Sequence, residues 1–191
     1  SIVVNPNNPD GRRFSPKDLL ALLPRVGHLV IDESFADAAS DLSLTSEAGQ
    51  SGLLILRSFG KFYGLAGLRL GFAIGHADDV TKLAAASGPW PVSGAAIAIG
   101  CRALRDEAWA KATSARLARD CVRLDEMAQA QGWRLVGGAP LFRLYETPDA
   151  LAAQEKLARA QIWSRAFAQS PTWLRLGLPG AEAEWTRLAE V

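Results

Sequence analysis

Asn8, Asp32 and Lys61 each follow a short apolar run, and their side chains could act together on one ligand. In α/β sheets, ligands bind at the carboxyl ends of the strands, so polar residues just after three strands could converge there. Each residue taken alone has an ordinary interpretation. Asn8 is also typical of a turn, Asp32 of a helix cap, and Lys61 of an exposed surface position.

As a set, these groups suit a pyridinium cofactor, whose protonated ring acts as an electron sink. Asp32 can hold the ring nitrogen protonated, Asn8 can donate to the ring hydroxyl, and Lys61 can form a Schiff base with the cofactor aldehyde. Ser58 lies three residues before Lys61, and Arg69 lies eight after it. A hydroxyl and a cation are what a cofactor phosphate needs. The sequence therefore predicts a site for pyridoxal 5′-phosphate (PLP).

Short apolar runs alternate with helical patterns in the first half of the chain, which favours an α/β fold with a mostly parallel sheet. The expected strands cover residues 2–4, 28–31, 53–56 and 70–74. A helix should start at the Ser15 cap, with Pro16 in its first turn, and stop near Pro24.

The second half has a different pattern and predicts a smaller α+β region. Its expected helices cover 80–86, 93–104, 106–131 and 148–160, with a last helix from 181. Its expected strands cover 133–136, 141–145, 162–167 and 173–178. Cys121 falls on the apolar stripe of the longest helix, which predicts a core position.

The composition excludes several classes of protein. The chain has 191 residues, a net charge of +1 and 49% hydrophobic residues. Without a long charge run or a long apolar run, neither a nucleic acid nor a membrane is an expected partner. Two cysteines and two histidines predict neither a disulfide framework nor a metal site. We expect a soluble, cytoplasmic protein.

Five motifs in consistent order resemble the fold-type I PLP enzymes, the aminotransferase class I/II family. They are Asn8–Gly11, Asp32–Phe35, Ser58–Lys61, Gly67–Phe72 and Leu174–Gly177. Each motif alone is weak, but the ordered set spans nearly the whole chain. The resemblance implies part of the mostly parallel sheet of a large PLP-binding domain, in residues 1–105, and a small C-terminal α+β domain, in residues 106–191.

Within that family, residues 57–69 and 174–180 are most similar to the threonine-phosphate decarboxylases of cobalamin biosynthesis. This resemblance implies decarboxylation of L-threonine O-3-phosphate to aminopropanol phosphate. Two alternatives stay open. One is an aminotransferase for a phosphorylated amino compound such as histidinol phosphate. The other is a non-catalytic α/β binding or scaffold domain with chance motifs.

The resemblance also implies roles for single residues. Lys61 would be the catalytic Schiff-base lysine, and Asn8, Asp32, Ser58 and Arg69 would bind the cofactor together with it. The substrate would be a small phosphorylated amino acid. The residues expected to bind its anionic groups are Arg175, for the carboxylate, and Arg165, for the second anion; for Arg165, an ordinary solvated position at a strand end is an equal alternative.

The chain departs from the family pattern at Phe35, where many relatives carry a tyrosine that donates to the ring oxygen. Without that donor, the pH at which the Schiff base titrates should differ from that of the tyrosine enzymes. The glycine-rich phosphate loop and the ring-stacking aromatic of the family would lie before Ser1. We therefore expect a C-terminal part of a longer, homodimeric enzyme that binds PLP poorly by itself. Stoichiometric PLP with strong cofactor absorbance in this isolated chain would contradict that expectation.

Overall fold

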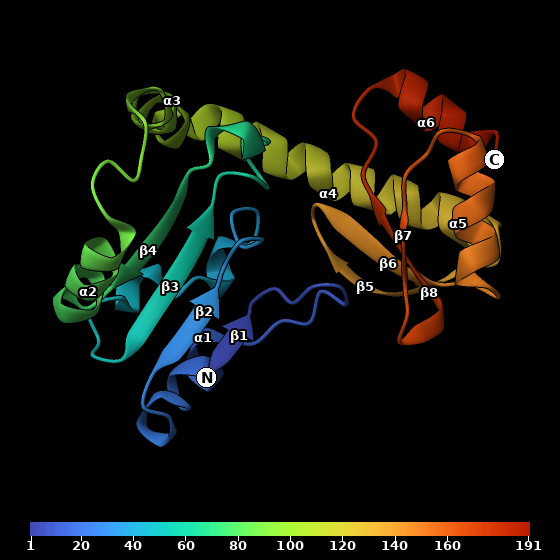
Figure 1. Cartoon of the computed structure of the whole chain (residues 1–191). Helices are drawn as coiled ribbons and strands as arrows, with labels where there is room; N and C mark the ends of the chain where they lie inside the picture. Colours follow the sequence, from blue (N-terminus) through green and yellow to red (C-terminus); the bar gives the residue numbers. More distant parts are fainter. The chain divides into compact units, whose positions relative to one another are not determined.

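The computed structural model describes all residues, Ser1–Val191, and the chain forms two compact units (Figure 1). The first unit contains Ser1–Asn7 and Arg12–Ala110, and the second contains Asn8–Gly11 and Lys111–Val191. The domain boundary expected after residue 105 concerns the complete protein and stays a prediction.

The first unit is built on a four-stranded sheet in the order β1-β2-β3-β4. Its strands are β1 (Ile2–Val4), β2 (Leu29–Asp32), β3 (Leu53–Ser58) and β4 (Gly71–Gly75). Strands β1, β2 and β3 are parallel, and β4 runs antiparallel to β3. The mostly parallel sheet is thus confirmed. The carboxyl ends of its three parallel strands share one edge, which is where polar residues can meet.

Apolar residues alternate with less buried ones along β2 and β3 and form the core of this unit. Leu29 and Ile31 in β2, and Leu53 and Ile55 in β3, are fully buried. They pack against Leu19 of α1 (Pro16–Leu20). The side-chain period of two residues along a strand explains why alternate positions supply this core.

The first helix ends earlier than expected. Ser15 caps it by accepting a 3.2 Å hydrogen bond from the Asp18 amide, as the sequence predicts. Helix α1 stops at Leu20, however, and a separate 3₁₀ turn covers Leu23–Arg25. Pro24 has no amide hydrogen and disfavours the α conformation of the residue before it, so the helix cannot continue through it.

The other helices of the first unit follow the sheet, and short 3₁₀ turns fill its loops. They are α2 (Ala77–Ser87), α3 (Gly94–Arg105), the start of α4 (Glu107–Ala130), and 3₁₀ turns at Ser40–Leu42, Thr45–Glu47 and Ala66–Leu68. None of the helices combines the length and the apolar character that a membrane-spanning helix requires.

The second unit is an antiparallel sheet packed with helices. The strand order is β5-β6-β8-β7. Its elements are β5 (Arg134–Ala139), β6 (Phe142–Glu146), α5 (Ala150–Arg159), β7 (Arg165–Phe167), β8 (Ser170–Gly177) and α6 (Glu182–Ala189). Tyr145, Leu174 and Trp185 are central to its core, together with Leu124 of α4. Cys121 is only half-buried, so the expected core position is partly wrong; its thiol lies 3.8 Å from the Pro140 carbonyl oxygen.

The turn Asn8–Gly11 packs backbone to backbone against β5. A Cβ atom on Gly11 would lie 2.0 Å from the Gly138 carbonyl oxygen, and one on Gly137 would lie 2.0 Å from the Asp10 carbonyl oxygen. Gly11 also has a φ of +68°, which side chains rarely adopt. These glycines hold the turn that carries Asn8 close to the sheet.

We therefore expect Gly11→Ala to lower the free energy of unfolding by about 3 kcal/mol, combining left-handed backbone strain with a backbone clash. Gly132→Ala is the matched control in the same unit. Gly132 has a φ of +76° but no atom within 4 Å of its Cβ position. The control should cost about 1 kcal/mol, from strain alone. Urea unfolding measures both, and equal losses in the two variants would show that the close packing is unimportant.

Candidate functional site

Asp32 ends β2, and its carboxylate is held by the next turn of chain. Its Oδ1 atom accepts hydrogen bonds from the Ser34 amide at 2.9 Å and from the Ser34 hydroxyl at 2.5 Å. Its backbone carbonyl accepts from the Asn5 amide at 2.9 Å. The carboxylate therefore has a defined orientation at the carboxyl edge of the sheet, where the sequence predicts a ligand-binding residue.

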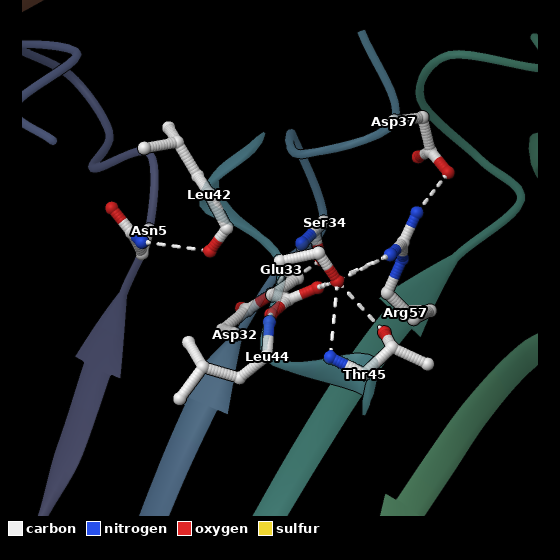
Figure 2. Close-up of polar contacts among 10 residues, drawn as sticks. Asn5, Asp32, Glu33, Ser34, Asp37, Leu42, Leu44, Thr45 and Arg57 are labelled. Carbon is white, nitrogen blue, oxygen red and sulfur yellow. Dashed lines mark hydrogen bonds and ion pairs between the residues drawn. The ribbon is translucent and has the colours of Figure 1, made fainter. Parts of the chain in front are cut away.

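A buried ion network lies directly beside Asp32 (Figure 2). The Glu33 side chain is 0% exposed, and its carboxylate accepts from the Leu44 amide at 2.6 Å and the Ser43 hydroxyl at 2.7 Å. Arg57 donates to Glu33 at 3.1 Å and, through its other terminal nitrogen, to Asp37 at 2.5 Å. A buried carboxylate persists only with such partners, because desolvation costs several kcal/mol.

This network joins the ends of two parallel strands. The Glu33 amide donates to the Leu56 carbonyl at 2.9 Å, one step beyond the β2–β3 ladder. Glu33 and Arg57 therefore lie on the same face, whereas their neighbours Asp32 and Ser58 fall on alternate positions. This pair was not predicted from the sequence. A charged residue next to a predicted site residue on each of two neighbouring strands is the pattern that could have indicated it.

Ser58 and Arg69 line one small cavity of about 190 Å³ in the first unit. Its remaining lining comes from Gly60, Ala66, Leu70 and Gly71. The Ser58 hydroxyl accepts a 3.2 Å bond from the Gly60 amide. Arg69 has a left-handed backbone with a φ of 52°, and its guanidinium donates to the Ala66 carbonyl at 3.2 Å. The structure thus brings together the two residues predicted to bind a phosphate.

Lys61 is exposed, and the loop that carries it is anchored by aromatic packing. Its Nζ atom lies 5.6 Å from the centroid of the Phe35 ring. The Phe59 and Tyr63 rings stack at 4.4 Å, and Tyr63 stacks on Trp109 at 5.8 Å. Burial raises the pKa of Tyr63, the nearby Asp37 carboxylate adds to this rise, and Arg57 opposes it. The amine is therefore available to a ligand, while its loop is fixed on both sides.

Arg165 and Arg175 lie opposite each other on the paired strands β7 and β8 in the second unit. Arg175 donates a hydrogen bond to the side-chain oxygen of Asn8. Burial lowers the pKa of Arg175, and repulsion from the Arg165 cation lowers it further. Two neighbouring guanidinium groups suit a ligand with two anionic groups, because bound anions would relieve this repulsion.

The predicted site residues therefore form two groups, one in each compact unit. The group in the first unit is Asp32, Ser58, Lys61 and Arg69, and the group in the second is Asn8, Arg165 and Arg175. The chain also contains no cluster of side chains suited to a metal ion. The roles of these residues stay predictions, while their grouping is a feature of the fold.

The sequence matches the family Aminotransferase class I and II over residues 2–191. It is 45% identical over 191 residues to the threonine-phosphate decarboxylase of Pseudomonas aeruginosa, covering 98% of this chain and 57% of that protein. It is 43% identical over 194 residues to the threonine-phosphate decarboxylase of a Sinorhizobium species, covering 99% of this chain and 58% of that protein. The chain thus spans a little over half the length of these relatives.

The fold is similar to that of solved aminotransferases. Histidinol-phosphate aminotransferase from Sinorhizobium meliloti, solved in complex with pyridoxal 5′-phosphate, superimposes with a TM-score of 0.90. The comparison covers 100% of this chain and 55% of that protein, at 22% sequence identity. At this identity, the likeness establishes the fold and leaves the chemistry to the site residues.

We expect Arg57→Met to lower the free energy of unfolding by about 3 kcal/mol, because it leaves the buried Glu33 carboxylate without its cation. Urea unfolding measures the loss. Adding Glu33→Gln to this variant should recover part of it, since the uncompensated charge is removed. Arg119→Met is the control, because Arg119 is exposed on α4 and lies outside this network. An unfolding free energy for Arg57→Met equal to that of the control would contradict the importance of the network.

Proposed function

This chain belongs to the aminotransferase class I and II family, and we propose that the protein carrying it is a PLP-dependent threonine-phosphate decarboxylase. The proposed reaction converts L-threonine O-3-phosphate to aminopropanol phosphate and carbon dioxide, a step of cobalamin biosynthesis. The observation that carries this proposal is the 45% identity to a threonine-phosphate decarboxylase across 98% of the chain. The proposal concerns the complete protein, because the chain covers 57% of that relative.

The residues of the first unit fit the cofactor. The cavity of about 190 Å³ beside Ser58 and Arg69 offers a hydroxyl and a guanidinium to the PLP phosphate. Asp32 presents a carboxylate for the proton on the ring nitrogen, and exposed Lys61 presents the amine that attaches the cofactor. When bound, the cofactor ring supplies an electron sink for the bond that breaks at the substrate α-carbon. Lys61 would also be the group that carries a proton to or from that carbon.

Arg165 and Arg175 are proposed to bind the two anions of the substrate. Their opposition on β7 and β8 matches a molecule with a carboxylate and a phosphate. Such binding would orient the substrate, and this orientation would decide which bond at the α-carbon breaks. Loss of the carboxylate would give carbon dioxide, whereas loss of the hydrogen would lead to transamination. The same arginines can serve both outcomes.

An aminotransferase for a phosphorylated amino compound is therefore the second candidate. It is supported by 33% identity over 195 residues to a histidinol-phosphate aminotransferase of Thiobacillus denitrificans, which covers 96% of this chain and 50% of that protein. The scaffold alternative is weakened, because the match to an enzyme family extends over residues 2–191 rather than over isolated motifs. The homodimer and the cytoplasmic location also stay proposals; light scattering on the purified complete protein measures the first.

The decisive experiment supplies L-threonine O-3-phosphate to the complete protein loaded with PLP. We expect release of carbon dioxide without any added keto acid, and no release from a Lys61→Ala variant, which lacks the amine. Amino transfer that requires a keto acid would instead establish the second candidate. If neither reaction occurs, and borohydride reduction attaches no cofactor to Lys61, the non-catalytic scaffold is the correct interpretation.

Arg165→Met should raise the KM for threonine phosphate about tenfold, the effect of losing one charge-assisted hydrogen bond to an anion. Arg165 lacks the bond to Asn8 that Arg175 makes, so its removal tests anion binding more directly. Steady-state kinetics at several salt concentrations measure the change. Arg159→Met is the control, because Arg159 forms an exposed pair with Glu155 on α5. An unchanged KM would assign Arg165 to the solvated surface.

Phe35→Tyr should move the pH titration of the bound cofactor's absorbance to lower pH. The new hydroxyl would donate to the ring oxygen and stabilise its anionic form, which weakens the hold on the proton shared with the Lys61 nitrogen. The Phe35 ring lies 5.6 Å from that nitrogen, so the added hydroxyl is introduced beside it. Phe35→Leu removes the ring without adding a donor and should not cause this downward shift. A titration midpoint that does not move in Phe35→Tyr would place the residue away from the ring oxygen.

A further inference from the structure

The side chain of Ser34 is hydrogen-bonded to the carboxylate of Asp32 (Figure 2). Its hydroxyl donates to Oδ1 at 2.5 Å, and its amide donates to the same atom at 2.9 Å. One oxygen of the carboxylate is therefore occupied by two donors from a single residue.

The segment that carries Ser34 is anchored on both sides, so its hydroxyl has a fixed position. The preceding residue, Glu33, bonds through its amide to the Leu56 carbonyl at 2.9 Å, and its buried carboxylate is paired with Arg57 at 3.1 Å. The Glu33 carbonyl accepts from the Ala36 amide at 3.0 Å, which closes the turn around Ser34. The ion network thus holds the backbone from which Ser34 reaches Asp32.

We propose that Ser34 is a positioning residue for cofactor binding, which fixes the orientation of the Asp32 carboxylate toward the ring nitrogen. This inference rests on the proposed function only through the cofactor, because Asp32 would pair with the ring in a decarboxylase and in an aminotransferase alike. Two donors on Oδ1 restrict the rotation of the carboxylate, so that Oδ2 is presented in a single orientation.

The hydrogen bond from the Ser34 amide to Asp32 is by itself an ordinary turn contact, since Asp side chains often accept from the backbone amide two residues later. The hydrogen bond from the Ser34 hydroxyl goes beyond that local pattern. Ser34→Ala removes the hydroxyl alone and leaves the amide donor in place. The variant therefore separates a positioning role from a turn that merely shapes the backbone.

The test measures PLP binding to the complete protein, after its cofactor has been removed, by absorbance titration. We expect Ser34→Ala to raise the Kd for PLP about tenfold, the effect of one lost hydrogen bond to a charged group. The pH range over which the bound cofactor's absorbance is stable should also narrow. Urea unfolding of the cofactor-free protein should be unchanged. Ser46→Ala, at an exposed serine in the 3₁₀ turn Thr45–Glu47, is the control and should bind PLP normally.

A double-variant cycle shows whether the effect passes through Asp32. With Asp32→Asn in place, adding Ser34→Ala should have no further effect on the Kd, because the carboxylate that Ser34 positions is gone. A Ser34→Ala protein with wild-type Kd and pH range would overturn the inference, and so would an equal loss in the Asp32→Asn background. The readouts need no substrate. If carbon dioxide is not released but Ser34→Ala still weakens PLP binding, the decarboxylase proposal fails and the role of Ser34 stands.

Discussion

The fully buried charge of Glu33 is the constraint on which the carboxyl edge of the first sheet depends. Its carboxylate needs the Arg57 cation and two further donors, from Ser43 and Leu44, to offset the loss of water. Those partners come from the end of β3 and from the loop after β2. Satisfying one buried charge therefore ties together the segments on which Asp32 and Ser58 lie.

Neighbouring residues at these strand ends contact different groups. Along a strand, successive side chains point to opposite faces. Glu33 and Arg57 bind each other on one face, while Asp32 and Ser58, the positions next to them, are the ones we propose for cofactor binding. A rigid scaffold beneath polar groups is what precise ligand binding needs, because mobile groups lose orientation. Ser34 adds to this by engaging Asp32 directly.

In the second unit, close backbone packing holds a predicted site residue in position. The turn that carries Asn8 lies against β5 because Gly11 and Gly137 have no side chains in the way. The side-chain oxygen of Asn8 accepts a hydrogen bond from Arg175, which lies opposite Arg165. Burial lowers the pKa of Arg175, and repulsion between the two neighbouring cations lowers it further. A pair of this kind is suited to an anionic ligand, whose charge compensates both.

The sequence by itself determined that Asp32 and Ser58 lie at strand ends and that Lys61 lies in the loop after the second of these strands. Apolar alternation and turn residues are local patterns, so they can be recognised from the sequence alone. It also determined the mostly parallel first sheet. Only the tertiary structure decided which distant groups meet. Arg57 pairs with Glu33 across 24 positions, and Arg175 reaches Asn8 across 167. No local pattern specifies such partners, since they follow from strand register and from the need to compensate charges removed from water.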